Sequence, residues 1–270
     1  MRAGSVQREE RAAILGVGIS VIDIECAVSI IDGWIAADDP HYVCVTGVHG
    51  VMESWADPTI AAIHNEAGLV TPDGMPLVWM ARWLGHPQIQ RVYGPDLMRA
   101  ITAISPERGY RHFYYGGPPG LVERLRDVLT SAHPGLNVVG VLSPPFRQLT
   151  PEEDTAVVAE INATNPDIVW VGLSTPKQER WMAAHLGRIN APVMIGVGAA
   201  FDFLACTKKQ APRWMQRSGL EWLFRASMEP RRLGRRYVRI VPSFLVLVLA
   251  QLLVSYWRKV SSPIPFDPRI

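Results

Sequence analysis

An aspartate in a tight turn is the first residue of this sequence that could do acid–base chemistry. Asp73 lies between Pro72 and Gly74, and a carboxylate held at such a turn could accept a hydroxyl proton as a general base. The same residue could instead cap the helix that is expected to begin near Gly74, which is a common role for aspartate. From spacing alone, the capping role is favoured.

Two further segments follow predicted strands and could contact a ligand. Gly116-Gly117 lies between a strand and a helix, where it would form either a phosphate cradle at a helix N-terminus or an ordinary tight turn. Lys177 and Gln178 open another helix, where they would supply charge and hydrogen bonds to a cleft or form part of an exposed loop.

Two other candidate residues, Asp202 and His49, lie near the ends of predicted strands. Asp202 could hold a ribose hydroxyl, although a cap on the next turn is favoured. Of the scattered histidines, His49 stands out because it follows a strand end. The sequence has no Asp-x-Asp pair, so we expect no metal site and no cofactor, and a pyrophosphate would be neutralised by arginines and helix ends.

The composition fits one sizeable α/β domain with an appendage. The chain has 270 residues, a net charge of only +2 and three cysteines, with no Cys-x-x-Cys motif. These values argue against a nucleic-acid-binding protein, a disulfide framework and a zinc site, and they favour the reducing cytoplasm. Residues 1–11 lack the apolar stretch of a signal peptide.

Short apolar runs alternate with helical patterns along most of the chain, which predicts a mostly parallel sheet with helices on both faces. Ligands of such sheets bind beyond the carboxyl ends of the strands, where most of these candidate residues fall. The predicted strands are Ile14–Ile19, His41–Thr46, Leu69–Thr71, Arg111–Tyr115, Asn137–Leu142, Asp167–Gly172 and Pro192–Val197. The predicted helices include Ile24–Ile35, one starting at Asp57-Pro58, Met75–Leu84, one opening at Thr150, and Pro176–Leu186.

The last part of the chain has a different character. A helical pattern over Gln210–Ala226 mixes tryptophans with arginines, a basic run follows, and Ile240–Trp257 is mostly apolar. We therefore divide the chain into a flexible arm (1–12), an α/β catalytic core (13–209) and a helical appendage (210–270). The apolar segment favours binding to the cytoplasmic membrane surface over spanning it, with packing on the core or on another subunit as the alternative.

Taken together, these segments resemble the WecG/TagA/CpsF family of glycosyltransferases, and they occur in the family order. The matching segments are Thr71–Pro76, Gln90–Leu97, Tyr115–Gly117, Gly172–Glu179, Gly196–Phe203, Ala211–Met215, Gly219–Arg225 and Glu229–Arg232. The resemblance implies inverting, metal-independent transfer of a sugar from a UDP-sugar to a polyprenyl-diphosphate-linked glycan in polysaccharide synthesis. It also implies an enzyme located peripherally on the inner face of the cytoplasmic membrane. The apolar tail could serve lipid or another subunit, so a homo-oligomer is an open alternative.

The resemblance also assigns roles to residues. It makes Asp73 the base, and it makes Arg91 and Gln178 contacts of the sugar or diphosphate. Three tail arginines would close over the site when the tail meets the membrane: Arg225, Arg232 and Arg235.

The sequence departs from the family at one position, because Gly47 stands where members often have an asparagine. Thr46 or His49 could substitute for that residue, and the sugar could be N-acetylmannosamine-like, glucose or a uronic acid. Two other functions compete with this interpretation. An oxidoreductase is disfavoured because Gly16-Val17-Gly18 and Gly196-Val197-Gly198 lack the final glycine of the dinucleotide fingerprint. A non-catalytic membrane-surface partner of a polysaccharide assembly complex is the second.

Overall fold

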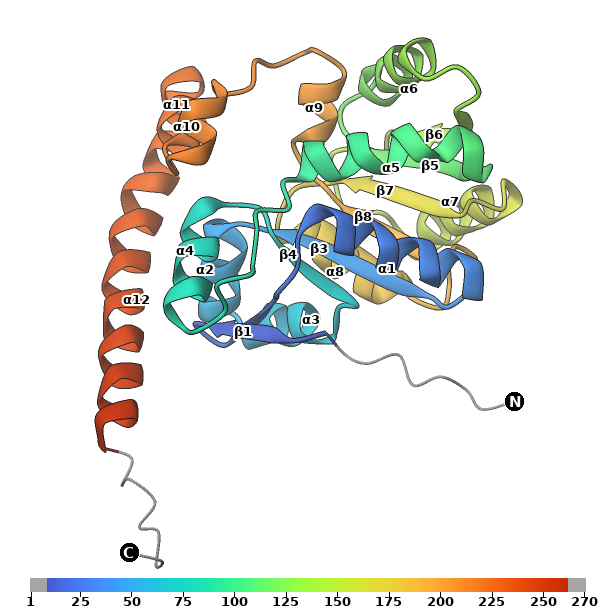
Figure 1. The fold of residues 1–270 in the computed structure, drawn as a ribbon. Coiled ribbons are helices and arrows are strands. Elements are labelled where there is room, and N and C mark those ends of the chain that lie inside the picture. Colours follow the sequence, from blue (N-terminus) through green and yellow to red (C-terminus); the bar gives the residue numbers. More distant parts are fainter. Residues whose placement is uncertain (1–8, 262–270) are drawn as a thin grey trace, which may run out of the picture.

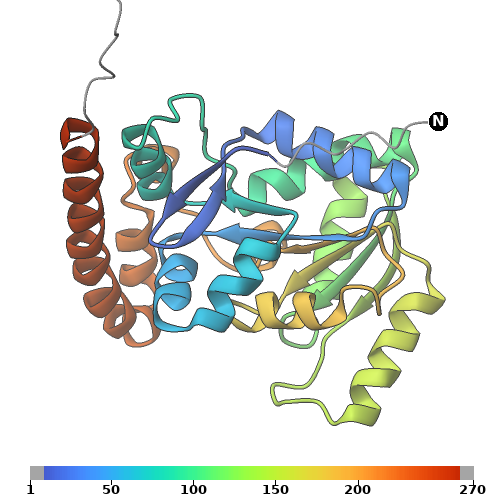
Figure 2. The ribbon, with the colours of Figure 1, turned by 90° about the horizontal axis from the view of Figure 1, so that it is seen from below.

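The structure, a computed structural model, describes residues 9–261 and consists of a parallel sheet covered by helices on both faces (Figures 1 and 2). The strand order of the six-stranded sheet is β4-β3-β8-β7-β5-β6, and its neighbouring strands are all parallel. The predicted fold class is therefore confirmed. The strands are β3 (His41–Thr46), β4 (Leu69–Pro72), β5 (Arg111–Gly116), β6 (Asn137–Leu142), β7 (Ile168–Gly172) and β8 (Val193–Gly196).

Alternation along each strand sends side chains into two separate cores. In β7, Ile168 and Trp170 belong to one buried cluster, whereas Val169 and Val171 belong to the other. Both faces of the strand are thus apolar, as expected for a parallel sheet covered on both sides. This arrangement leaves the ends of the strands as the place where polar groups can gather.

Helix starts were predictable where a capping residue marks them. Asp23 accepts a hydrogen bond from the Cys26 amide at 2.9 Å, Asp57 accepts one from Thr59 at 2.8 Å, and Thr150 forms a capping box. Three core helices were not predicted: α2 (Val48–Ala56), α5 (Gly94–Arg108) and α9 (Ala200–Leu204). The core helices are α1 (Ile24–Ala37), α2 (Val48–Ala56), α3 (Pro58–Glu66), α4 (Met75–Trp83), α5 (Gly94–Arg108), α6 (Leu121–Ala132), α7 (Pro151–Ala163), α8 (Lys177–His185) and α9 (Ala200–Leu204).

The predicted strand Ile14–Ile19 is wrong, because a turn divides it. β1 (Arg11–Ile14) and β2 (Val17–Ser20) form an antiparallel hairpin, with positive φ at Leu15 and Gly16. The predicted arm of residues 1–12 is correspondingly too long. Arg11 and Ala12 lie in β1, and the Arg11 guanidinium donates to the backbone oxygen of Gly68 at 2.9 Å. Residues 1–8 of that arm lie outside the described part.

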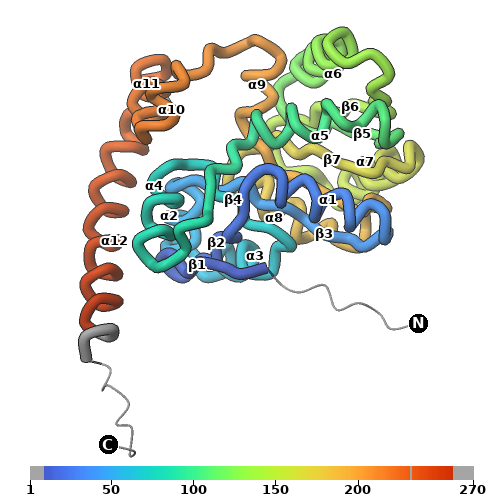
Figure 3. Tube along the Cα trace, in the orientation of Figure 1, coloured from blue at the N-terminus to red at the C-terminus, as the bar shows by residue number. Residues whose placement is uncertain are grey.

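The appendage descends along one side of the core (Figures 1 and 3). The predicted helix over Gln210–Ala226 is in fact two helices, because Gly219 between them has a positive φ of 70°. A Cβ at Gly219 would lie 2.7 Å from the Trp79 ring of α4, so this turn packs tightly on the core. The elements are α10 (Arg213–Arg217), α11 (Glu221–Met228), η1 (Pro230–Gly234), which is a single π-helical turn, and α12 (Arg235–Ser261).

One face of α12 packs on the core. Phe244 is buried, and the Gln251 side chain donates to Ala13 O at 2.7 Å and accepts from Leu15 N at 3.0 Å. The opposite face exposes large apolar side chains to solvent, among them Val246, Leu249 and Leu253. By length and composition alone, Arg235–Trp257 could cross a membrane.

Close packing of two strand ends generates a stability prediction. A Cβ at Gly116, where φ is 124°, would lie 2.7 Å from the Gly172 carbonyl group. Gly116→Ala is therefore expected to destabilise the fold by about 3 kcal/mol, from overpacking and left-handed strain together. The control is Gly33→Ala in α1, where an added Cβ would have no other atom within 4 Å. This substitution is expected to stabilise the helix by about 0.5–1 kcal/mol. Denaturant unfolding measures both, and equal stabilities of the two variants would contradict the packing argument.

Candidate active site

One large cavity lies beyond the carboxyl ends of the strands. It is lined by the turns that follow β3, β4, β5, β7 and β8 on one side and by α11 and α12 on the other. Its volume is about 2040 Å³, whereas a pocket for one drug-sized ligand measures about 300–1,000 Å³. The cavity therefore has room for more than one ligand group.

Asp73 projects into this cavity from the turn between β4 and α4. Its backbone amide donates to Thr46 O at 3.0 Å, and its Oδ1 accepts from the Gly94 amide at 2.9 Å. Gly94 begins α5, and no side chain caps α4. The capping role predicted for Asp73 on α4 is therefore wrong: the carboxylate accepts a hydrogen bond from the start of a different helix, and its Oδ2 lies beside Gly47, 3.7 Å from where a Cβ would stand.

The electrostatic surroundings of Asp73 favour its protonated form. Burial raises the pKa of the Asp73 carboxyl above its ordinary value, and the negative charge of Glu221 raises it further. The neighbouring Arg91 and the Gly94 hydrogen bond lower the pKa but do not cancel the effect of burial. A carboxylate of this kind is a stronger proton acceptor than an exposed aspartate.

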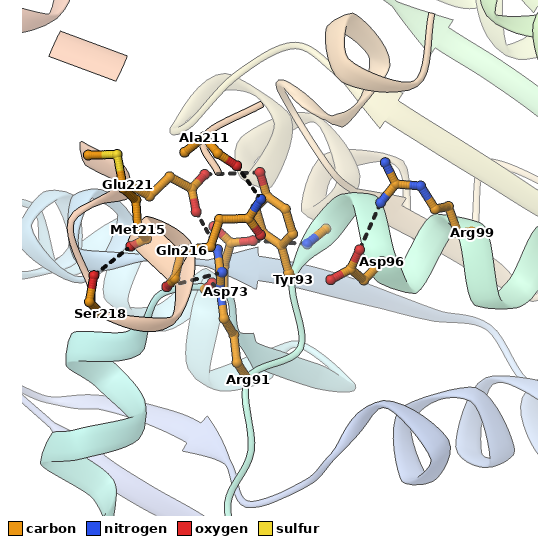
Figure 4. Close-up of polar contacts among 11 residues, drawn as sticks. Asp73, Arg91, Tyr93, Asp96, Arg99, Ala211, Met215, Gln216, Ser218 and Glu221 are labelled. Carbon is orange, nitrogen blue, oxygen red and sulfur yellow. Dashed lines mark hydrogen bonds and ion pairs between the residues drawn. The ribbon is translucent and has the colours of Figure 1, made fainter. Parts of the chain in front are cut away.

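An ion pair joins the core to the appendage above Asp73 (Figure 4). The guanidinium of Arg91 donates to the backbone oxygen of Asp73 and to the carboxylate of Glu221 on α11. Tyr93 donates its hydroxyl to the same carboxylate at 2.9 Å, and the Arg91 guanidinium lies 4.0 Å from the centre of the Tyr93 ring. Arg91, predicted as a substrate contact, lines the cavity but is paired with protein groups.

Three basic side chains line the cavity without an ion-pair partner among the described residues: Lys177, Arg225 and Arg236. Arg225, from α11, was predicted. Arg235, predicted beside it, is exposed and does not line the cavity, whereas Arg236 does. Adjacent helical residues point about 100° apart, so the basic run alone could not show which arginine faces inward. The side chain of Arg232 lies outside the described part.

Of the two residues proposed to replace the family asparagine, only His49 lines the cavity. Its Nε2 lies 3.1 Å from Glu53 Oε1. Burial, Arg236 and Arg225 lower the pKa of His49 to about 4, so the ring is neutral near pH 7. Thr46 is buried and does not line the cavity. Its hydroxyl lies 3.0 Å from His64 Nε2 in the interior.

Gln178 and Lys177, which were also predicted as substrate contacts, both line the cavity. Gln178 is buried and lines the cavity, and its Oε1 has no hydrogen-bond partner within residues 9–261. Lys177 lies over the ring of Phe146, 4.7 Å from its centroid.

The glycine pair and Asp202 serve mainly structural contacts. The Gly117 amide donates to Gly172 O at 3.1 Å, so it is not free to bind an anion, although Gly117 lines the cavity. Asp202 lies inside α9 and does not cap it; it lines the cavity, accepts from the Thr207 hydroxyl at 3.2 Å and lies 3.4 Å from Lys208 Nζ. Within the described residues, no group of three or more His, Cys, Asp or Glu side chains could hold a metal ion.

Comparisons with known proteins agree on one family. Residues 12–258 match the family model described as "Glycosyl transferase WecG/TagA/CpsF family". A curated relative from Staphylococcus aureus (strain MW2) is 29% identical over 67% of this chain and 68% of its own length. A relative from Bacillus subtilis (strain 168) is 27% identical over 69% of this chain and 70% of its own. Both are named N-acetylglucosaminyldiphosphoundecaprenol N-acetyl-beta-D-mannosaminyltransferase.

The placement of His49 generates a prediction that needs no substrate. Because Arg236 disfavours the protonated imidazole, Arg236→Ala is expected to raise the pKa of His49 from its value of about 4. Arg235→Ala, which changes an exposed neighbour of equal charge, is the control and should leave that pKa nearly unchanged. NMR titration of labelled histidine side chains measures both, and an unchanged His49 in Arg236→Ala would show that Arg236 does not face it.

Proposed function

Because the chain belongs to the WecG/TagA/CpsF family of glycosyltransferases, we propose that it moves a sugar from a UDP-sugar onto a polyprenyl-diphosphate-linked glycan. The product would serve the synthesis of a cell-surface polysaccharide. The observation that carries the proposal is the Asp73 carboxylate, partly buried and of raised pKa, in a cavity that is also lined by Arg225 and Arg236, which have no ion-pair partner in the described part of the chain. The names of the relatives, which specify a diphosphoundecaprenol-linked acceptor, support the choice of acceptor.

In the proposed reaction Asp73 acts as the general base. Its carboxylate takes the proton of the acceptor hydroxyl while that oxygen attacks the anomeric carbon of the donor. The bond between the anomeric carbon and the diphosphate oxygen breaks on the opposite face, and UDP leaves with the bonding electron pair. The configuration at the anomeric carbon is inverted, and the proton on Asp73 passes to solvent after the product leaves.

The leaving diphosphate needs charge stabilisation and no added proton, which explains why one carboxylate suffices. Arg225 and Lys177 line the cavity without ion-pair partners among the described residues and would supply that charge. Arginine suits this role because its planar fork of donors matches phosphate oxygens. A divalent ion is therefore not required, and transfer is expected to persist in excess chelator.

The choice of donor sugar rests on the names of the relatives and on Gly47. The relatives are named as N-acetylmannosaminyltransferases, which makes N-acetylmannosamine the first donor to test. Gly47 has no side chain beside Asp73 Oδ2, so a hydrogen bond from that position is missing and a different sugar, glucose or a uronic acid, is also to be tested. His49 and Gln178 are two polar residues of the cavity that would contact it.

The appendage is proposed to hold the enzyme at the cytoplasmic face of the membrane and to close the cavity. The exposed apolar face of α12 would enter the lipid interface, with basic residues before the apolar segment near the headgroups. The contacts of Glu221 with Arg91 and Tyr93 already hold α11 above Asp73. Such a cover would exclude water from the reaction.

Substitution of the base tests the proposal directly. Asp73→Asn is expected to lower acceptor-dependent UDP release at least about a hundredfold, since general bases contribute about 10²- to 10⁴-fold. The assay uses a panel of UDP-sugars with an undecaprenyl-diphosphate-linked acceptor. Asp96→Asn, which changes an exposed carboxylate of α5, is the control and should retain activity. Full activity of Asp73→Asn would remove Asp73 from the base role, and wild-type protein that releases no UDP with any donor would favour a non-catalytic partner.

The same variant should not be less stable near neutral pH. The folded-state pKa of Asp73 is raised, so the folded protein binds its proton more tightly than the unfolded chain does. Ionisation of Asp73 therefore costs stability as the pH rises through the raised pKa. Asp73→Asn removes that cost, and thermal unfolding separates this outcome from a loss of activity through misfolding.

The charge of Glu221 generates a pH prediction. Since Glu221 raises the pKa of Asp73, Glu221→Gln is expected to shift the acidic limb of the kcat/KM profile to lower pH. The loss of its partner also frees the Arg91 charge, which acts in the same direction. Glu160→Gln on the exposed side of α7 is the control. A limb that stays in place or moves to higher pH would contradict the assignment of that limb to Asp73.

A further inference from the structure

One end of the cavity continues as an apolar groove between α4 and α12. Its walls are built from helical faces, since the lining residues recur every three or four positions. The α4 wall is formed by Met75, Pro76, Trp79, Met80 and Trp83, and the α12 wall by Ile240, Val241, Phe244, Leu245, Val248 and Leu252. We call this the α4–α12 groove.

Large apolar side chains of the groove are exposed to solvent. Trp83 is 75% exposed and Leu245 54% exposed, although both line the cavity. No lining residue of either wall is charged. Exposed apolar surface of this extent marks a binding site more often than an ordinary surface.

Positive charge lies at one end of the groove. Arg236 lines the cavity at the start of α12, and its Nε is buried without a hydrogen-bond partner in the described part of the chain. Arg225 and His49 line the same cavity, and the charges of both arginines act on the His49 ring and lower its pKa. The cavity therefore passes from a cationic end to an uncharged apolar wall.

We propose that the α4–α12 groove binds the isoprenoid chain of the acceptor, with the acceptor diphosphate at Arg236, while Arg225 and Lys177 remain with the donor diphosphate. This inference rests on the proposed function and adds a binding site for a part of the substrate that takes no part in the chemistry. An isoprenoid diphosphate has the same distribution of properties as the groove, a doubly charged head joined to an uncharged hydrocarbon chain. The groove then fixes the depth at which the glycan reaches Asp73.

The length of the groove fits an extended chain. From Ile240 to Leu252 the helix rises about 18 Å at 1.5 Å per residue, so the groove holds only the first part of a polyprenyl chain and leaves the rest in the membrane. The outer face of α12 is apolar as well. A helix with one apolar face in the lipid and the other along the groove would let the chain leave the bilayer without crossing water.

The matched test compares two acceptors that share the glycan and the diphosphate. One carries an undecaprenyl chain and the other a methyl group, and both are assayed with full-length protein in detergent micelles. The double variant Trp83→Ala/Leu245→Ala is expected to raise KM for the undecaprenyl acceptor about tenfold, from the loss of buried apolar area. Its KM for the methyl acceptor and for the UDP-sugar should stay within about twofold of the wild-type values.

The chain offers a close control. Trp55 of α2 and Leu186 at the end of α8 are 54% and 42% exposed, but neither lines the cavity. Trp55→Ala/Leu186→Ala should leave both KM values unchanged. If the control has the same effect, or if the groove variant affects both acceptors equally, the proposal is overturned. It is also overturned if the groove variant changes the oligomeric state in sedimentation, which would make the groove an interface between copies.

Two outcomes separate this inference from the proposed function. Wild-type protein that transfers to both acceptors with the same KM overturns the groove and leaves the transferase intact. Wild-type protein that transfers to neither contradicts the transferase, and the groove is then judged by labelling with a benzophenone-bearing farnesyl diphosphate. Labelled peptides from α4 and α12 that are lost in Trp83→Ala/Leu245→Ala support the groove, and labelling elsewhere overturns it.

Discussion

The site depends on one ion pair, between Arg91 of the core and Glu221 of the appendage. Both side chains are largely buried, and Arg91 also donates to the backbone oxygen of Asp73. Burying two charges is costly unless further hydrogen bonds satisfy them, and Tyr93 supplies one of these. The pair is therefore better understood as a device that fixes the appendage over the carboxylate than as a source of stability. With α11 held there, Arg225 lines the same cavity as Asp73.

The packing of the strand ends allows this arrangement. Gly116 meets the Gly172 backbone at a distance that leaves no room for a Cβ, and Gly196 lies against the ends of the Gln178 and Met182 side chains. These glycines therefore serve close packing, and the Gly117 amide is engaged by Gly172. Anion binding in the cavity falls to side chains instead, which agrees with the arginines and the lysine that line it without ion-pair partners among the residues that the structure describes. The proposed stabilisation of a diphosphate is thus a property of the appendage as much as of the sheet.

Local signals made much of the fold predictable, and the misses have physical causes. His41–Thr46 and Asn137–Leu142 match their strands because apolar runs end at clear breaks. The hairpin inside Ile14–Ile19 was missed because the turn at Leu15 and Gly16 interrupts an otherwise apolar run. Helix α5 was also missed, although Pro95 in its first turn and Gly109 after its end are typical of a helix start and a helix end. The sequence could not show that Arg236 lines the cavity and that Thr46 does not. Both outcomes depend on how α12 and β3 are rotated about their axes, which tertiary packing decides.

The roles proposed for Asp73 and for the α4–α12 groove make opposite demands on solvation, and this architecture meets both. The proposed base requires a poorly solvated carboxylate, which fits its raised pKa, and the proposed lipid acceptor requires an apolar path that reaches the same place. A closed core could provide the first but would exclude the second. An appendage bound at one end by Arg91 and Glu221, and at the other by Gln251 on the hairpin turn, provides both, because the space between its two attachments stays open along α4. The groove is thus a consequence of how the cover is attached, which is why the apolar walls and the charged head of the cavity are continuous.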